Sequence, residues 1–172
     1  EIVFVNDNEE QTIKKLENAI RTSDIVLTTG GISVGKYDFV GKAFQHLGVQ
    51  TLFYKVAQKP GKPLFFGKLN SCFIFGLPGN PAAALSCFYE YVYPGIRIMQ
   101  GHQSIFLRKQ MMQLENEVPK KGDRALFLKG KINNGKVQAL QGQDSNNISS
   151  FATADCQIYI PAEKGNISVG EE

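Results

Sequence analysis

The pattern of apolar and polar residues near the start of the chain changes from strand-like to helical. Residues 2–5 form a continuous apolar run, which predicts a short buried strand. Asn8 and Gln11 resemble a capping box, and the apolar residues that follow recur at helical spacing. We therefore predict a helix over residues 9–22.

Strand and helix patterns continue to alternate up to Gly101. Further strands are predicted over residues 25–28, 49–56, 64–66 and 72–75, with helices beginning after Asp38 and at Pro81. Strands joined by helical crossovers are typical of a parallel sheet. Residues 1–101 are therefore predicted to form an α/β domain, with a mostly parallel sheet and helices on both faces.

After Gly101 the helical periodicity stops. Residues 124–132 and 136–140 alternate around Asn133-Asn134-Gly135, a strong hairpin signal, and residues 156–160 read as another strand. We expect residues 102–172 to form a small β-rich domain, in the form of a β-barrel.

Composition narrows the range of functions. The 172 residues carry a net charge of +3, too mild a balance to indicate a duplex nucleic-acid partner. No apolar run approaches the ~20 residues of a membrane-spanning helix. The 3 cysteines are widely spaced, which favours a reducing compartment such as the cytoplasm. With only 2 histidines, a zinc cage and a serine–histidine triad are both disfavoured.

Lysines gather in a part of the chain that has no acidic residue. Residues 39–89 hold five lysines and no Asp or Glu, and Lys55, Lys59 and Lys62 lie in one proline-containing loop. A solvated loop is the simpler interpretation of a lysine cluster. The stiff backbone beside a predicted strand end nevertheless favours an anion site, because like charges held together need a counter-charge.

Two glycine-containing loops also follow predicted strands. Thr29-Gly30-Gly31-Ile32-Ser33-Val34-Gly35 could let a ligand approach the backbone closely, although such turns are often only structural. Leu77-Pro78-Gly79-Asn80-Pro81 leads into a helix, where a phosphate could bind. Asp38 could cap the next helix or, with Asp7, hold a hard metal such as magnesium.

These segments together resemble a known family. The loop from Thr29 to Gly35 with Asp38, the segment Lys59-Pro60-Gly61-Lys62-Pro63 and the segment Gly76-Leu77-Pro78-Gly79-Asn80-Pro81 look like the C-terminal half of molybdopterin molybdenumtransferases. These enzymes are related to the E domain of gephyrin. The resemblance implies a molybdopterin-binding fold of the MogA-like type followed by a β-barrel domain. It also implies a cytoplasmic homodimer that inserts molybdate into adenylylated molybdopterin and releases AMP, with Mg²⁺ present.

The resemblance also implies roles for single residues. Asp7 and Asp38 would serve the metal and the adenylate, and Lys59 and Lys62 would act with them in catalysis. Substrate contacts would come from Thr29, Gly30, Gly31, Ser33, Lys55, Pro78, Pro81, Arg124 and Ser145.

Departures from the family pattern keep alternatives open. Ala83 stands where the family commonly has a serine, and the family's N-terminal domains are absent, so we expect a fragment that binds ligand without turnover. A molybdopterin adenylyltransferase-like enzyme and a non-catalytic gephyrin-like scaffold module remain the other readings. An adenylyltransferase is also a candidate partner.

Overall fold

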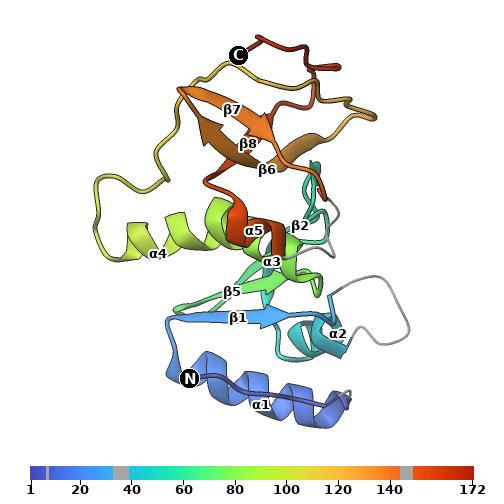
Figure 1. Ribbon diagram of the computed structural model, residues 1–172. Helices are drawn as coiled ribbons and strands as arrows, with labels where there is room; N and C mark the ends of the chain where they lie inside the picture. Colours follow the sequence, from blue (N-terminus) through green and yellow to red (C-terminus); the bar gives the residue numbers. More distant parts are fainter. Residues whose placement is uncertain (7, 33–38, 144–148) are drawn as a thin grey trace. The chain divides into compact units, whose positions relative to one another are not determined.

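The computed structural model describes residues 1–6, 8–32, 39–143 and 149–172 (Figure 1). Its contacts divide the chain into two compact units, residues 1–56 with 61–80 and residues 57–60 with 81–172. Each unit has its own core. The predicted domain boundary at residue 101 stays a prediction.

The first unit is a four-stranded sheet with two helices. In chain order its elements are α1 (Glu9–Thr22), β1 (Ile25–Thr29), α2 (Phe39–His46), β2 (Gln50–Tyr54), β4 (Phe65–Leu69) and β5 (Cys72–Leu77). The predicted helix over 9–22 is confirmed as α1, and the Asn8 side chain accepts a hydrogen bond of 2.9 Å from the Gln11 amide at its start.

The strands of this sheet lie in the order β1-β5-β4-β2, and their directions are mixed. β1 and β5 are parallel, whereas β5–β4 and β4–β2 are antiparallel. The α/β class is confirmed, but the expectation of mostly parallel strands is wrong for these pairs. Only Asn70 and Ser71 join β4 to β5, too short a link for the crossover that parallel strands need.

The predicted strand over residues 2–5 is also wrong. This segment has no regular secondary structure, and Ile2 and Phe4 are 84% and 92% exposed. An apolar run becomes a strand only when another strand accepts its hydrogen bonds. None of the described strands pairs with it.

The core of the first unit lies between the sheet and its helices. Leu16 and Ile20 of α1 and Phe44 of α2 pack with Val26 and Ile74 of the sheet. Both helices cover this same face, and α1 and α2 lie beside each other (Figure 1). The predicted helix cover of the other face stays a prediction. That face carries contacting aromatic rings from Phe53, Phe66, Phe73 and Phe75.

The second unit combines a short helical stretch with a β-rich part. Its elements are β3 (Gln58–Lys59), α3 (Pro81–Cys87), the π-helix η1 (Phe88–Val92), α4 (Tyr93–Met99), β6 (Ala125–Asn133), β7 (Lys136–Ala139), α5 (Ser149–Thr153) and β8 (Cys156–Ile160). The helix predicted at Pro81 is confirmed as α3, and Pro94 is the second residue of α4, which follows η1 without a break.

The β-rich part is organised around β6. This strand pairs with β3 in parallel and with β7 and β8 in antiparallel directions. The predicted hairpin is confirmed, because Asn133 pairs with Lys136 across a turn whose φ angles are +45° at Asn134 and +77° at Gly135. The core here includes Leu114, Leu126 and Ile160. Closure into a barrel stays a prediction.

Candidate functional site

One row of paired residues crosses all four strands of the first unit. Thr28 of β1 pairs with Gly76 of β5, Gly76 pairs with Phe65 of β4, and Phe65 pairs with Tyr54 of β2. Just beyond this row lie the ends of β1, β2 and β5 and the start of β4. The loops that the sequence singled out in this unit therefore emerge at a single end of the sheet.

The glycine turn after β1 packs directly on the loop after β5. Gly30 donates a 3.2 Å hydrogen bond to the Leu77 carbonyl, and its φ is +82°. A Cβ atom added at Gly79 would lie 3.2 Å from the Gly30 Cα. Both loops thus need glycine here, Gly30 for its backbone angle and Gly79 for the close approach.

Two of the three loop lysines lie at the same sheet end. Lys55 directly follows β2, and its amide donates 2.8 Å to the Leu64 carbonyl. The Val56 amide donates 3.0 Å to the Lys62 carbonyl, which brings the Lys55 and Lys62 backbones together. Both side chains are exposed, so their ammonium groups can reach a ligand. Lys55 Nζ lies 4.9 Å from the centre of the Tyr54 ring.

Lys59 belongs to the second unit. The pairing of β3 with β6 brings its backbone near that of Arg124. β3 pairs Gln58 with Ala125 and Lys59 with Leu126, and the Ala125 amide donates 3.0 Å to the Ala57 carbonyl. Arg124 precedes β6 directly. Lys59 is exposed and Arg124 is half-buried. Two cations that lie 65 positions apart in the sequence are thus brought to the same part of the fold, one on β3 and one directly before β6.

The remaining predicted residues divide into two groups. Thr29 and Gly31 are exposed at the end of β1, Pro78 is buried directly after β5, and Pro81 opens α3 in the second unit. Asp7, Ser33, Asp38 and Ser145 lie outside the described residues.

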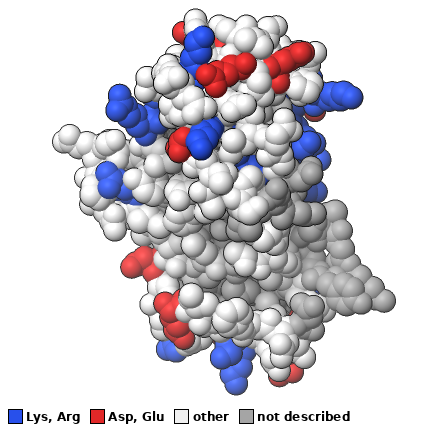
Figure 2. All heavy atoms as spheres, in the orientation of Figure 1, with Lys and Arg blue, Asp and Glu red and all other residues white. Residues whose placement is uncertain are grey.

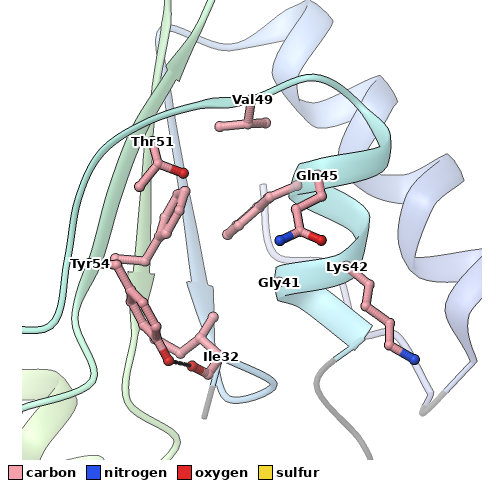
Figure 3. Close-up of a pocket in the computed structure, with 9 residues that line it drawn as sticks. Ile32, Gly41, Lys42, Gln45, Val49, Thr51 and Tyr54 are labelled. Atoms are coloured by element: carbon pink, nitrogen blue, oxygen red, sulfur yellow. Dashed lines mark hydrogen bonds between the residues drawn. The ribbon is translucent and has the colours of Figure 1, made fainter. Parts of the chain in front are cut away.

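A cavity adjoins this sheet end on the face that carries the helices (Figure 3). Its volume is about 360 Å³, and Phe44 and Phe65 form an apolar wall with ring centres 4.7 Å apart. Gln45 points from α2 towards β2, whereas Lys42 extends away from Tyr54 (Figure 3). The cavity is large enough for a small planar molecule.

Tyr54 lines this cavity. Its hydroxyl donates a 2.7 Å hydrogen bond to the carbonyl of Ile32, the residue that follows the glycine turn (Figure 3). Ile32 is only 3% exposed, so this bond satisfies a buried acceptor. Sequence reasoning missed Tyr54 and Gln45, because nothing in their spacing distinguishes them from ordinary residues of a strand and a helix.

Charge on the visible face of the molecule is mixed. Among the described residues in the view of Figure 2, acidic and basic side chains are interspersed over the β-rich part.

Two family descriptions match the chain. The one described as "Probable molybdopterin binding domain" matches residues 1–98, and "MoeA C-terminal region (domain IV)" matches residues 112–172. The chain belongs to the molybdopterin-binding domain family. The two matches follow each other along the chain.

Curated relatives agree with this assignment. A molybdopterin molybdenumtransferase of Haemophilus influenzae is 37% identical over 96% of this chain and 42% of its own length. The enzyme of the same name from a Nostoc species is 30% identical over 98% of this chain and 41% of its own. The chain thus spans about two fifths of these relatives.

Solved structures share the fold. A molybdenum cofactor biosynthesis protein from Pyrococcus furiosus superposes with a TM-score of 0.78 at 26% identity, over 97% of this chain and 54% of that one. A molybdopterin biosynthesis MoeA protein from another Pyrococcus species gives the same TM-score and identity, over 96% of this chain and 40% of that one. In the described part of this chain, no helix is long and apolar enough to span a membrane.

Proposed function

We propose that this chain is the molybdopterin-binding and C-terminal part of a molybdopterin molybdenumtransferase. The reaction inserts molybdate into adenylylated molybdopterin and releases AMP. The observation that carries the proposal is the common sheet end where the turn from Thr29, the loop at Pro78, and Lys55 and Lys62 meet. The names of the curated relatives support it.

The chemistry of the substrates suits these residues. Molybdate and phosphate are both tetrahedral oxyanions, so backbone amides and lysines can bind either. We assign Thr29, Gly30, Gly31 and Ser33 to the pterin phosphate. Lys55, Lys59 and Lys62 would bind phosphate or molybdate oxygens, with Arg124 and Ser145 as further contacts and Pro78 and Pro81 shaping the wall.

The lysines would also aid the reaction itself. As an oxygen of water or molybdate bonds to the adenylate phosphorus, the bond from that phosphorus to the bridging oxygen breaks. Its electron pair remains on the pterin phosphate, where negative charge develops, and AMP is released. Ammonium groups that are already in position stabilise that charge without having to move into place. This is the role proposed for Lys59 and Lys62.

Magnesium would be held by Asp7 and Asp38, which both lie outside the described residues. Asp7 precedes Asn8, which caps α1, and Asp38 precedes Phe39, which begins α2. The first turns of these helices are linked, since Lys42 Nζ lies 3.8 Å from a Glu9 carboxylate oxygen. Carboxylate oxygens are the ligands that Mg²⁺ prefers, and the bound ion would neutralise phosphate charge.

The proposal extends to a protein of the length of the curated relatives, of which this chain spans about two fifths. It includes a homodimer located in the cytoplasm and an adenylyltransferase partner that supplies the adenylylated pterin. The match of residues 112–172 to the MoeA C-terminal region favours the molybdenumtransferase over an adenylyltransferase-like enzyme or a gephyrin-like scaffold module.

Calorimetry with molybdate and with adenylylated molybdopterin tests the proposal. Lys62→Ala is expected to weaken binding by ~1–3 kcal/mol, the cost of a lost charged contact, with little change in Tm because Lys62 is exposed. Lys68→Ala is the matched control, because Lys68 lies at the other end of β4, opposite Phe73. Equal affinities for wild type and Lys62→Ala would contradict the proposed anion site.

A turnover assay with the same protein tests whether this chain binds its ligand without catalysing the reaction. The chain is mixed with adenylylated molybdopterin, Mg²⁺ and molybdate, and AMP release is followed. We expect binding without release, since transition-state stabilisation needs every charged group in place. Release at a rate comparable to that of a full-length relative would show that this part is sufficient for catalysis.

A further inference from the structure

The segment that carries Lys59 has little backbone support of its own. β3 consists of Gln58 and Lys59 only, and it pairs with two residues of β6. So short a ladder holds a strand weakly, because each net hydrogen bond contributes only about 1 kcal/mol. The position of Lys59 must therefore depend on further contacts.

The side chain of Gln58 supplies these contacts. It is only 2% exposed, and its Nε2 donates 2.9 Å to the Pro60 carbonyl, a bond that spans Lys59. Its Oε1 accepts a hydrogen bond from the Tyr91 hydroxyl. The Pro60 oxygen can only accept, so the amide nitrogen must face it and the amide oxygen must face Tyr91.

The π-helix η1 brings Tyr91 to this amide. A π-turn holds one residue more than an α-turn, which shifts the side chains that follow relative to regular helical spacing. Burial is the main reason that the pKa of the Tyr91 hydroxyl rises to about 12. The hydroxyl therefore keeps its proton and can donate it in a hydrogen bond. Burial likewise raises the pKa of Cys87 to about 12, so the Sγ atom 3.7 Å from Gln58 Nε2 belongs to a neutral thiol.

We propose that Tyr91 is a positioning residue that acts through Gln58 to hold Lys59 for anion binding. The hydroxyl of Tyr91 fixes the Gln58 amide, the amide fixes the Pro60 carbonyl, and Lys59 lies between these two anchors. The part that concerns binding rests on the proposed function, in which Lys59 contacts an oxyanion. The part that concerns the Lys59 backbone does not.

Hydrogen exchange tests the backbone part without any ligand. Tyr91→Phe removes only the hydroxyl. We expect exchange of the amide hydrogens of residues 57–59 to become roughly two- to tenfold faster, which is the factor for one net hydrogen bond. Tyr89→Phe is the matched control, because Tyr89 lies on the same π-helix and is 37% exposed. Unchanged exchange in Tyr91→Phe would overturn the proposal.

A double-mutant cycle with molybdate as the probe tests the binding part. By calorimetry on the whole chain, Tyr91→Phe is expected to raise the Kd of molybdate about two- to tenfold, and Tyr89→Phe to leave it unchanged. In the Lys59→Ala background, Tyr91→Phe should have no further effect, because its influence passes through Lys59. A merely structural role would weaken binding equally in both backgrounds and would overturn the proposal.

The hydrogen-exchange and molybdate-binding measurements distinguish this inference from the proposed function. If the wild-type chain fails to bind molybdate, the proposed anion site is wrong and Lys59 is not held for that ligand. The exchange measurement then still decides whether Tyr91 holds the backbone of residues 57–60. If molybdate binds but Tyr91→Phe changes neither exchange nor Kd, only the positioning role is wrong.

Discussion

The backbones of Gly30 and Gly79 approach each other so closely that a side chain on Gly79 would meet the Gly30 Cα at 3.2 Å. Gly30 also donates a hydrogen bond to Leu77, two residues before Gly79. The two loops that follow the parallel strands β1 and β5 are thus in direct backbone contact. This contact joins two of the three segments that mark the family.

Gly79→Ala is therefore expected to destabilise the chain and to weaken ligand binding. The added methyl group meets backbone rather than a flexible side chain, so one loop must move, at a cost of about 1–3 kcal/mol. Tm should fall by roughly 2–4 °C for each kcal/mol. Calorimetry with adenylylated molybdopterin should show a higher Kd.

Gly165→Ala is the control for this change. A Cβ atom at Gly165 meets nothing within 4 Å, so its Tm and Kd should stay at wild-type values. If Gly79→Ala behaved like Gly165→Ala in both measurements, the tight contact between the two loops would contribute neither to stability nor to ligand binding.

Tyr54→Phe tests the link between β2 and the glycine turn. The change removes the 2.7 Å hydrogen bond to the Ile32 carbonyl and leaves a buried acceptor without this donor. We expect a loss of about 1–3 kcal/mol in the free energy of unfolding, measured by urea denaturation. Tyr159→Phe is a control on another exposed tyrosine, at 58% exposure. Equal stability of Tyr54→Phe and wild type would mean that water replaces the lost donor.

Local signals in the sequence predicted those features whose cause is local. The capping residue Asn8 and the helical period gave α1 with its observed bounds, and Asn134-Gly135 gave the β6–β7 hairpin, because both depend on neighbouring residues only. The motif loops could be placed at strand ends for the same reason. Their meeting at one sheet end follows from the register of β1, β5, β4 and β2.

Features that depend on distant partners could not be predicted in this way. The apolar residues 2–5 looked like a strand, yet a strand also needs a neighbour to pair with. The bond from Tyr91 to Gln58 joins residues 33 positions apart, and it depends on a π-turn that no periodicity indicated. Residues that are so far apart in the sequence leave no local pattern from which their contact could be predicted.

Asp38→Asn tests the proposed magnesium site. Asn is as good a helix N-cap as Asp, so the free energy of unfolding should change by less than about 0.5 kcal/mol. Removing the carboxylate charge should weaken Mg²⁺ binding, since the ion prefers charged oxygen ligands. Titration of the chain with Mg²⁺ in the presence of adenylylated molybdopterin measures this, with Asp155→Asn in the second unit as the control. An unchanged Mg²⁺ affinity would contradict the proposed magnesium site.

The raised pKa of Tyr91 predicts how stability falls at high pH. Burial raises the pKa of this hydroxyl from 10.0 to about 12, so the folded chain keeps the proton to a higher pH than the unfolded chain does. The stabilisation is therefore complete below pH 10 and is lost as the pH rises through about 12. Urea denaturation should show a loss of about 1–2 kcal/mol from Tyr91 across this range, less than the full shift implies because the ring is partly exposed. Residue 91 cannot ionise in Tyr91→Phe, so the stability curve of this variant should be flatter by that amount. Parallel curves for Tyr91→Phe and wild type above pH 10 would show that the hydroxyl ionises in the folded chain as readily as in the unfolded one. Such a result would argue against the hydrogen bond from Tyr91 to Gln58.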